Sequence, residues 1–286
     1  MNDDVWTLRR VLNWTAGYFD RKGSDTARLD AELLISHALR MSRMQLYTEY
    51  QKPLKGHELA AIRALVERRG GGEPVAYLTG QKGFWTIDIE VSPSVLIPRP
   101  ETELLVELGL KHLQTVESPR VLDLCCGSGC IGLALGHERQ DASILGTDIS
   151  ADALSVASRN RDRLGLTNVE FGQHDGLEDI SGEYDLLVSN PPYIETAQIS
   201  KLMPSVREFE PIIALDGGDD GLNFYRRIAM HAASMVSAKG LILLEIGCDQ
   251  AASVSALFDS AGFSDVTVHQ DLAGLDRVIR VSASKA

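Results

Sequence analysis

The chain has 286 residues, of which 44% are hydrophobic and 24% charged, a composition typical of a globular protein with one large or two ordinary domains. Its 28 Lys and Arg residues against 40 Asp and Glu residues give a net charge of −12, which argues against broad electrostatic binding of nucleic acid. No apolar run approaches the roughly 20 residues that a membrane helix needs, and the acidic N-terminus does not resemble a signal peptide. We therefore expect a cytoplasmic enzyme or binding protein that contacts neither nucleic acid directly nor a membrane.

Apolar residues recur at helical spacing in the first part of the chain, around residues 8–19, 31–39 and 59–66. The last of these patterns stops at Gly70-Gly71-Gly72, a strong helix terminator. Residues 1–73 are therefore predicted to form a small helical domain. The residues themselves leave open whether this domain is only a structural bundle or a module that docks a partner.

Residues 74–98 are predicted to form a linker that resembles a β-hairpin, because apolar and polar residues alternate over most of Phe84 to Val91. The next segment, Ile97-Pro98-Arg99-Pro100-Glu101-Thr102-Glu103, holds two prolines, which exclude a central strand. Pro100 is suited to open a helix, and acidic residues in a first turn favour the helix dipole.

Strand-like and helical patterns alternate in the rest of the chain, which we assign to a second domain over residues 99–286. Such alternation predicts an α/β fold, a mostly parallel sheet with helices on both faces. Two runs near the C-terminus, 266–268 and 277–281, have no helical pattern between them and are predicted to pair antiparallel at the edge of the sheet. Four apolar runs mark strands of the parallel part: residues 120–124, 143–146, 184–189 and 241–246.

The first predicted strand of this domain ends in a turn of small residues, which is followed by a helix. Strand, small-residue turn and helix form the geometry of a ligand site at the carboxyl end of a sheet. Glycines in such a turn let the backbone approach a ligand, because no Cβ is present. The next strand ends at Asp148, whose carboxylate can accept hydrogen bonds from ribose hydroxyls. The turn residues are Cys125, Cys126, Gly127, Ser128 and Gly129.

This turn does not by itself identify the nucleoside. Gly127, Gly129 and Gly132 match the spacing G-x-G-x-x-G, so glycine spacing alone does not exclude a protein that binds NAD. Three of the four cysteines crowd the same turn, where they cannot cross-link distant segments, and the seven histidines show no pair at metal-ligand spacing. We therefore expect small reduced cysteines packed in the turn, with neither a disulfide framework nor a metal site.

The run 184–189 is followed by Asn190, Pro191, Pro192 and Tyr193, a stiff loop that presents an amide side chain, carbonyl oxygens and an aromatic ring. These groups suit the methylation of a planar NH₂ group, whose nitrogen gains positive charge as it attacks a sulfonium methyl. The oxygen of Asn190 and the carbonyl of Pro191 can accept its two N–H bonds. Tyr193 can pack on the planar target or face the cationic methyl group.

The combination of Asp123-Leu124-x-x-Gly127-Ser128-Gly129 with the Asn190 loop resembles class I S-adenosylmethionine (AdoMet)-dependent methyltransferases that act on amino or amide nitrogen. Other motifs narrow the resemblance to the peptide chain release factor glutamine N5-methyltransferases, the HemK/PrmC family, over about residues 75–286. These motifs are Tyr77–Gly80, Ile97–Glu103, Glu210-Pro211 with Ala214-Leu215, and Gly217-Gly218-x-Asp220-Gly221-Leu222.

The resemblance implies a Rossmann-like fold with a mostly parallel seven-stranded sheet, and a small helical domain that docks the partner. It also implies a substrate, the glutamine in the Gly-Gly-Gln loop of a release factor, and S-adenosylhomocysteine as a product. Cys125 to Gly129 would contact AdoMet, Asp148 would hold the ribose, and the loop Asn190 to Tyr193 would hold the glutamine amide, with Asn190 also near the cofactor.

Two features depart from the family pattern. Cys125 and Cys126 stand where relatives usually have Gly and a small residue, which leaves the backbone less free. The neighbourhood Gln173-His174-Asp175-Gly176 lacks the aromatic residue that some relatives place beside the adenine, so we assign Asp175 to the adenine amino group. Three alternatives stay open: a glutamine methyltransferase that acts on a ribosomal protein, an adenine-N6 DNA methyltransferase, and an NAD-dependent protein.

Overall fold

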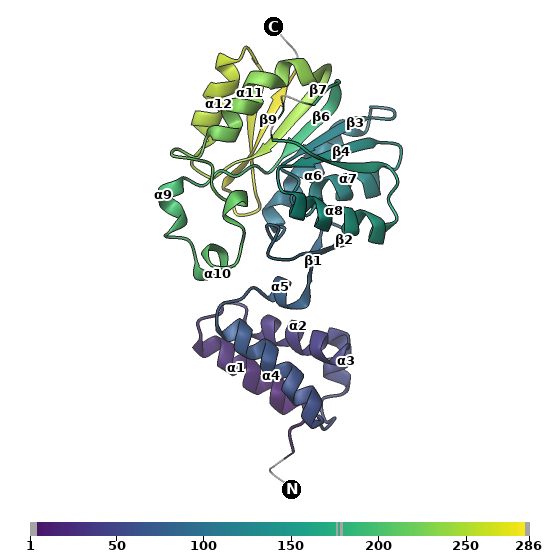
Figure 1. Cartoon of the computed structure of the whole chain (residues 1–286), viewed down its shortest axis with the longest axis vertical. Helices are drawn as coiled ribbons and strands as arrows, with labels where there is room; N and C mark the ends of the chain where they lie inside the picture. Colours follow the sequence, from purple (N-terminus) through teal and green to yellow (C-terminus); the bar gives the residue numbers. More distant parts are fainter. Residues whose placement is uncertain (1–4, 176, 178–179, 284–286) are drawn as a thin grey trace. The chain divides into compact units, whose positions relative to one another are not determined.

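The computed structural model describes residues 5–175, 177 and 180–283 (Figure 1). The chain divides into two compact units, Met1–Gln81 and Lys82–Ala286. Within the described ranges, no helix is long and apolar enough to cross a membrane.

The first unit is helical, as predicted, and its helices pack around a core that includes Leu12, Phe19, Leu34 and Ile62. The three helical patterns of the sequence are confirmed, and the third of these helices ends at Gly70. Two short helices were not predicted, because five or six residues are too few to show a period. The helices are α1 (Leu8–Arg21), α2 (Ala27–Leu39), α3 (Arg43–Thr48), α4 (Gly56–Gly70) and α5 (Val75–Thr79).

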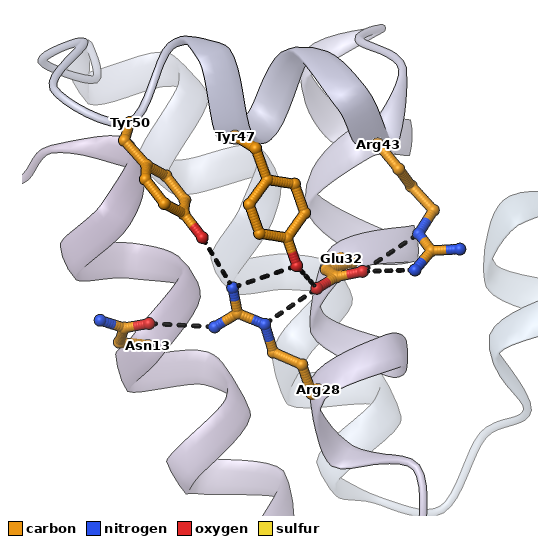
Figure 2. Close-up of polar contacts among 6 residues, drawn as sticks. All are labelled: Asn13, Arg28, Glu32, Arg43, Tyr47 and Tyr50. Carbon is orange, nitrogen blue, oxygen red and sulfur yellow. Dashed lines mark hydrogen bonds and ion pairs between the residues drawn. The ribbon is translucent and has the colours of Figure 1, made fainter.

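A buried carboxylate, that of Glu32 on α2, holds part of this unit together (Figure 2). Its side chain is 3% exposed, and it accepts hydrogen bonds from Arg28 Nε at 2.9 Å, Arg43 at 2.6 Å and the Tyr47 hydroxyl. Burial alone would raise the pKa of Glu32, but the three donors lower it below the ordinary value. The cluster therefore joins α2 to α3, and Arg28 extends it through hydrogen bonds to Asn13 of α1 and to Tyr50.

A hairpin forms within the segment 74–98, but it is shorter than predicted: β1 (Gln81–Phe84) and β2 (Ile87–Glu90) pair as a two-stranded sheet, whereas Val75–Thr79 is helical and the first unit extends to Gln81 rather than to residue 73. Hydrogen bonds attach Glu90 and Trp85 of the hairpin to other parts of the second unit. Asn160, which is buried, accepts the N–H of Glu90 at 2.7 Å and donates to its carbonyl at 3.0 Å. Glu103 accepts the N–H of Trp85 at 2.9 Å. The acidic first turn thus holds the hairpin, in addition to any effect on the helix dipole.

The second unit is built on a seven-stranded sheet in the order β5-β4-β3-β6-β7-β9-β8, which confirms the predicted fold class. β3 to β7 are parallel, whereas β9 pairs antiparallel with both β7 and β8, so the predicted C-terminal pair lies at the sheet edge. The strands are β3 (Arg120–Leu124), β4 (Ser143–Asp148), β5 (Val169–Gln173), β6 (Tyr184–Ser189), β7 (Val236–Glu245), β8 (Val266–Gln270) and β9 (Asp276–Ser282).

Helices cover both faces of this sheet (Figure 1). Leu186 and Leu243 face the helix that carries Gly109, whereas Leu187 and Ile242 belong to the core cluster that includes Tyr225. This alternation follows from the two-residue period of a strand, and burial on both faces explains the continuous apolar runs. The principal helices are α6 (Glu103–Leu113), α7 (Cys130–Glu138), α8 (Ala151–Leu164), α11 (Asn223–Met235) and α12 (Ala251–Ser260).

Two strand predictions need correction. β7 begins at Val236 rather than at residue 241, whereas β4 ends at Asp148, as expected. β5 lies outside the four apolar runs, because it is an edge strand in which only Val169 is buried and the other residues are partly buried or exposed. Short helical turns complete the unit: η1 (Pro100–Thr102), α9 (Thr196–Ile199), α10 (Pro204–Arg207) and η2 (Ile212–Ala214). Pro100 does open a helical segment, as predicted, although its first turn is of the 3-10 type.

Candidate active site

One pocket in the second unit lies where the carboxyl ends of β3, β4 and β6 meet the loops that follow them. The turn after β3, Asp148 at the end of β4 and Asn190 after β6 all line it, together with part of the segment 94–102 and the first turns of α11. Ligands of open parallel sheets bind at this edge, because successive loops diverge there and leave a crevice.

The turn after β3 uses left-handed backbone conformations at three positions. Gly129, with a φ of +79°, has no room for a side chain, because a Cβ would lie 2.8 Å from the ring of Phe171. Cys125 has a φ of +55°, in a region that residues other than glycine rarely adopt. Cys125, which stands where relatives usually have glycine, therefore places backbone strain in the first residue of the turn.

The cysteines of this turn are packing residues, as predicted. Cys126 and Cys130 are buried, and all four cysteines of the chain are free. Burial raises the pKa of Cys130 to about 12 and raises the pKa values of Cys125 and Cys126 well above the ordinary range. Their thiols therefore stay protonated at neutral pH and are poor nucleophiles.

Asp148 ties the turn to the end of β4. Its Oδ2 accepts the N–H of Gly127 at 2.9 Å, and its Oδ1 accepts the N–H of Ser150 at 2.9 Å. Burial raises the pKa of Asp148, while these backbone hydrogen bonds partly oppose the increase. Ser150 is the N-cap of α8, since its hydroxyl accepts the N–H of Ala153 at 3.2 Å. Each carboxylate oxygen keeps a lone pair for a ligand in the pocket.

The loop Asn190–Tyr193 has two buried prolines, and Asn190, half-buried, lines the pocket. Hydrogen bonds from Gln250, in the C-terminal part of the unit, hold the far end of this loop. Gln250 donates to the carbonyl of Tyr193 at 2.9 Å and to that of Gly221 at 3.3 Å. A Cβ on Gly221, whose φ is +71°, would lie 2.4 Å from the same Tyr193 carbonyl. Close backbone approach thus explains the last glycine of the motif at 217–222.

Asn190 also belongs to a buried chain of hydrogen bonds. Its Nδ2 donates to Thr102 Oγ1 at 3.2 Å, and that hydroxyl donates to Glu245 Oε2 at 2.6 Å. Tyr193 completes the chain, with its hydroxyl 3.4 Å from Glu245 Oε1. Thr102 and Glu245 are each 2% exposed. Burial raises the pKa of Glu245 to about 7.

A second buried carboxylate connects the segment 97–103 to the loop before η2. Glu210 accepts from Arg99 at 2.6 Å and from the N–H of Ile97 at 3.3 Å. Its side chain is 2% exposed and that of Arg99 is 34% exposed. Two motifs that lie 111 residues apart in the sequence therefore form one structural feature at the pocket.

Most of the predicted site residues meet in this pocket. Its lining includes Cys125, Cys126, Gly127, Ser128, Asp148, Asp175, Asn190 and Pro192. Gly129 and Pro191, in contrast, are not among the described lining residues, and neither is Tyr193, which packs against the core cluster instead.

Asp175 is exposed and forms an ion pair with Arg227 at 3.2 Å, so its assignment to adenine stays a prediction. Gly176, which belongs to the same predicted neighbourhood, lies outside the described residues.

Sequence reasoning missed Thr102, Glu245, Arg99 and Glu210 as parts of the site. One signal was available: Glu245 ends a buried apolar strand, as Asp148 ends β4, and a carboxylate at the carboxyl end of a parallel strand faces the ligand edge. The sequence places Arg99 and Thr102 in a helix start and in a motif of the resemblance, without a role in the site.

Comparisons with known proteins identify relatives of both units. Residues 10–80 match the family model of the PrmC N-terminal domain, and residues 101–205 match the Methyltransferase small domain. A solved methyltransferase from Pyrococcus furiosus, 16% identical, shares the fold with a TM-score of 0.52, covering 77% of this chain and 97% of that chain. The sheet, the turn after β3 and these matches define the second unit as a class I methyltransferase domain.

Two curated relatives are more specific. A release factor glutamine methyltransferase from Geobacter sulfurreducens is 44% identical over 278 residues, which cover 96% of this chain and 96% of the relative. A protein of the same name from Xylella fastidiosa is 45% identical over 252 residues, 88% of this chain and 91% of the relative. The chain belongs to the release factor glutamine methyltransferase family.

Proposed function

We propose that this protein transfers a methyl group from AdoMet to the side-chain amide nitrogen of the glutamine in the Gly-Gly-Gln loop of a peptide chain release factor. The observation that carries the proposal is that Asn190 and Asp148 line one pocket. An amide acceptor and a nucleoside-binding carboxylate are the two groups that this reaction requires side by side. The names of the relatives support the choice of a release-factor glutamine as the substrate.

The pocket fits a nucleoside cofactor. The carboxylate of Asp148 is held by two backbone N–H groups and retains lone pairs for ribose hydroxyls. The turn from Cys125 to Gly129 would hold the rest of the cofactor, and we keep Asp175 as the partner of the adenine amino group. When bound, AdoMet supplies a methyl group activated by a sulfonium centre.

The residues of the Asn190 loop address the weak nucleophilicity of a glutamine amide. Its lone pair is delocalised, and conjugation is lost as the nitrogen attacks. Asn190 Oδ1 and the carbonyl of Pro191 would accept the two N–H bonds as positive charge develops, at about 3 kcal/mol for each well-placed acceptor. Alignment of nitrogen and methyl can contribute roughly 7–11 kcal/mol more. No strong general base is needed, because the N–H proton becomes acidic only after the nitrogen has taken the methyl group from the sulfonium, and the proton would then pass to solvent water.

The experiment uses the full-length protein, tritium-labelled AdoMet and a purified release factor. Label should enter the wild-type release factor and be absent from a variant with alanine in place of the loop glutamine. Label retained on that variant would place the methyl group elsewhere. Parallel incubations with ribosomal protein and with adenine-containing DNA test the alternative substrates, and we expect neither to be labelled.

We further propose that the helical unit contributes to docking of the release factor and that the reaction takes place in the cytoplasm, where translation ends. The docking role predicts that substitutions on the exposed surface of α1 or α4 raise the KM for the release factor but leave S-adenosylhomocysteine binding unchanged. A Trp14→Ala variant is suitable, because this side chain on α1 is 51% exposed.

A further inference from the structure

The side-chain amide of Asn190 has two possible orientations, and only one places an oxygen toward the substrate. If the amide were rotated by 180°, its NH₂ group would meet the NH₂ group of the glutamine, and two donors would face each other. Two prolines fix the backbone after Asn190 but do not determine this rotation. A neighbouring group has to select it.

Thr102 is the neighbour that contacts this amide, and its hydroxyl has one proton. While Glu245 is ionised, that proton is directed to its Oε2 at 2.6 Å, since an ionised carboxylate can only accept. The oxygen of Thr102 therefore presents a lone pair to Asn190, and only the NH₂ group of the amide can satisfy it, at 3.2 Å. The opposite orientation would bring the Asn190 oxygen against an oxygen that has no proton to offer.

The register between β6 and β7 places Glu245 beside Asn190. Ser189 of β6 pairs with Leu244 of β7, so the next residues, Asn190 and Glu245, lie level at the carboxyl ends of two parallel strands. The carboxyl group is buried and is held by the hydroxyls of Thr102 and Tyr193, while Tyr225 donates to its backbone carbonyl at 2.7 Å. Within the described residues, no Lys or Arg forms an ion pair with this carboxyl group, although the charge of Arg277 acts on it. Burial of such a group is costly for stability, which points to a role in the site.

We propose that Thr102 and Glu245 are positioning residues that hold the Asn190 amide with its oxygen turned to the substrate. This inference rests on the proposed function. It assigns a role to the threonine of the motif at 97–103 and to the acid at the end of β7. Neither residue needs to touch the glutamine: each acts through Asn190.

The test compares Thr102→Val, which removes the hydroxyl at nearly constant volume, with Thr102→Ser, which keeps it. We expect kcat for release-factor methylation to fall about tenfold in Thr102→Val, the effect of one net hydrogen bond, and to recover in Thr102→Ser. The dissociation constant of S-adenosylhomocysteine should stay within about twofold, because Asp148 and the turn are unchanged. An unchanged kcat in Thr102→Val would overturn the proposal.

A double-mutant cycle separates positioning from a general structural effect. In an Asn190→Ala background, Thr102→Val should lower kcat no further, because the amide that it orients is gone. A full second loss would show that Thr102 acts independently of Asn190, which would also overturn the proposal. If Thr102→Val fails to fold, Glu245→Gln replaces it in the same cycle, since an amide can donate to Thr102 and reverse its hydroxyl.

A readout that needs no substrate distinguishes this inference from the proposed function. In protein labelled with ¹⁵N-asparagine, the Asn190 side-chain NH₂ signal is identified by its loss in Asn190→Ala. This signal should shift in Thr102→Val and stay in place in Thr102→Ser. A wild-type enzyme that fails to methylate release factor would refute the function alone, whereas an unshifted signal would refute the orientation by Thr102.

Discussion

The backbone N–H of Gly127 donates to Oδ2 of Asp148 across 2.9 Å, so the turn after β3 and the end of β4 are held as one unit. The same carboxylate accepts the N–H of Ser150 at the start of α8. The shape of the turn therefore depends on one side chain, the same one that we propose holds the ribose of the cofactor.

Asp148→Asn should weaken binding of S-adenosylhomocysteine by about 10- to 100-fold, because an amide offers one acceptor where the carboxylate offers two. Isothermal titration calorimetry measures this change. Asp152→Asn, on the exposed first turn of α8, is the matched control and should bind normally. Equal affinities for wild type and Asp148→Asn would remove Asp148 from the cofactor site.

Asn190→Ala should lower kcat by about 100-fold or more, the size of effect seen when one preorganised polar group is removed from a transition state. S-adenosylhomocysteine should still raise the melting temperature, because the residues of the turn and Asp148 remain. Single-turnover methylation of the release factor and a thermal-shift titration make the two measurements. Normal turnover in this variant would contradict the mechanism.

The pH dependence of kcat should show an acid limb near pH 7. Burial raises the pKa of Glu245 to about 7, so the carboxyl group becomes protonated below that pH and can donate to Thr102, which frees the Asn190 amide to rotate. The groups that face it are Thr102 and Glu101 from η1, Tyr193, Arg277 of β9 and Tyr225 of α11.

Glu245→Gln should have a lower kcat that no longer changes across this range. The measurement is kcat from pH 5.5 to 8.5 at saturating concentrations of both substrates, within the range in which the protein stays folded. An identical acid limb in wild type and Glu245→Gln would assign the titration to another group.

Gly221→Ala should destabilise the fold and slow methylation, because its Cβ would lie 2.4 Å from the carbonyl of Tyr193. Gly262→Ala is a matched control: its φ of +91° is also left-handed, but nothing lies within 4 Å of the added atom. We expect the free energy of unfolding, measured by urea denaturation, to fall by about 1 kcal/mol in the control and by about 3 kcal/mol or more in Gly221→Ala. Similar losses in both would show that backbone strain, not contact with the loop, explains the glycine.

Glu32→Gln should destabilise the helical unit at neutral pH by about 1–2 kcal/mol, because the hydrogen bonds from Arg28 and Arg43 lose their ionised acceptor, while both guanidinium groups are partly exposed and regain water. The lowered pKa of Glu32 stabilises the folded state above the pKa of the unfolded chain, and this contribution disappears as the pH falls through the folded value. The difference between wild type and variant should therefore shrink on acidification.

Thermal unfolding from pH 7 down to pH 3 measures this difference. Glu49→Gln breaks only an exposed pair with Lys52 and should change stability little at any pH. A difference between wild type and Glu32→Gln that is constant with pH would show that the charge of Glu32 is not what stabilises the cluster.

Local patterns allowed most of the architecture to be predicted. The helical period around Leu12 and Leu34 marks two of the helices in the first unit, and the apolar runs that end at Leu124 and Ser189 mark buried parallel strands. β5 was not predicted, because an edge strand buries only part of its surface. α3 was not predicted, because a single short helix does not establish a period.

The sequence by itself determined the fold class, the small-residue turn at Cys125–Gly129, Asp148 and the rigid loop at Asn190, because each depends on local backbone geometry or on a short motif. Only the tertiary structure decided that Thr102 and Glu245 meet at Asn190, and that Arg99 joins Glu210. These contacts span 88 to 143 residues. They arise from strand register and packing, which no local pattern encodes.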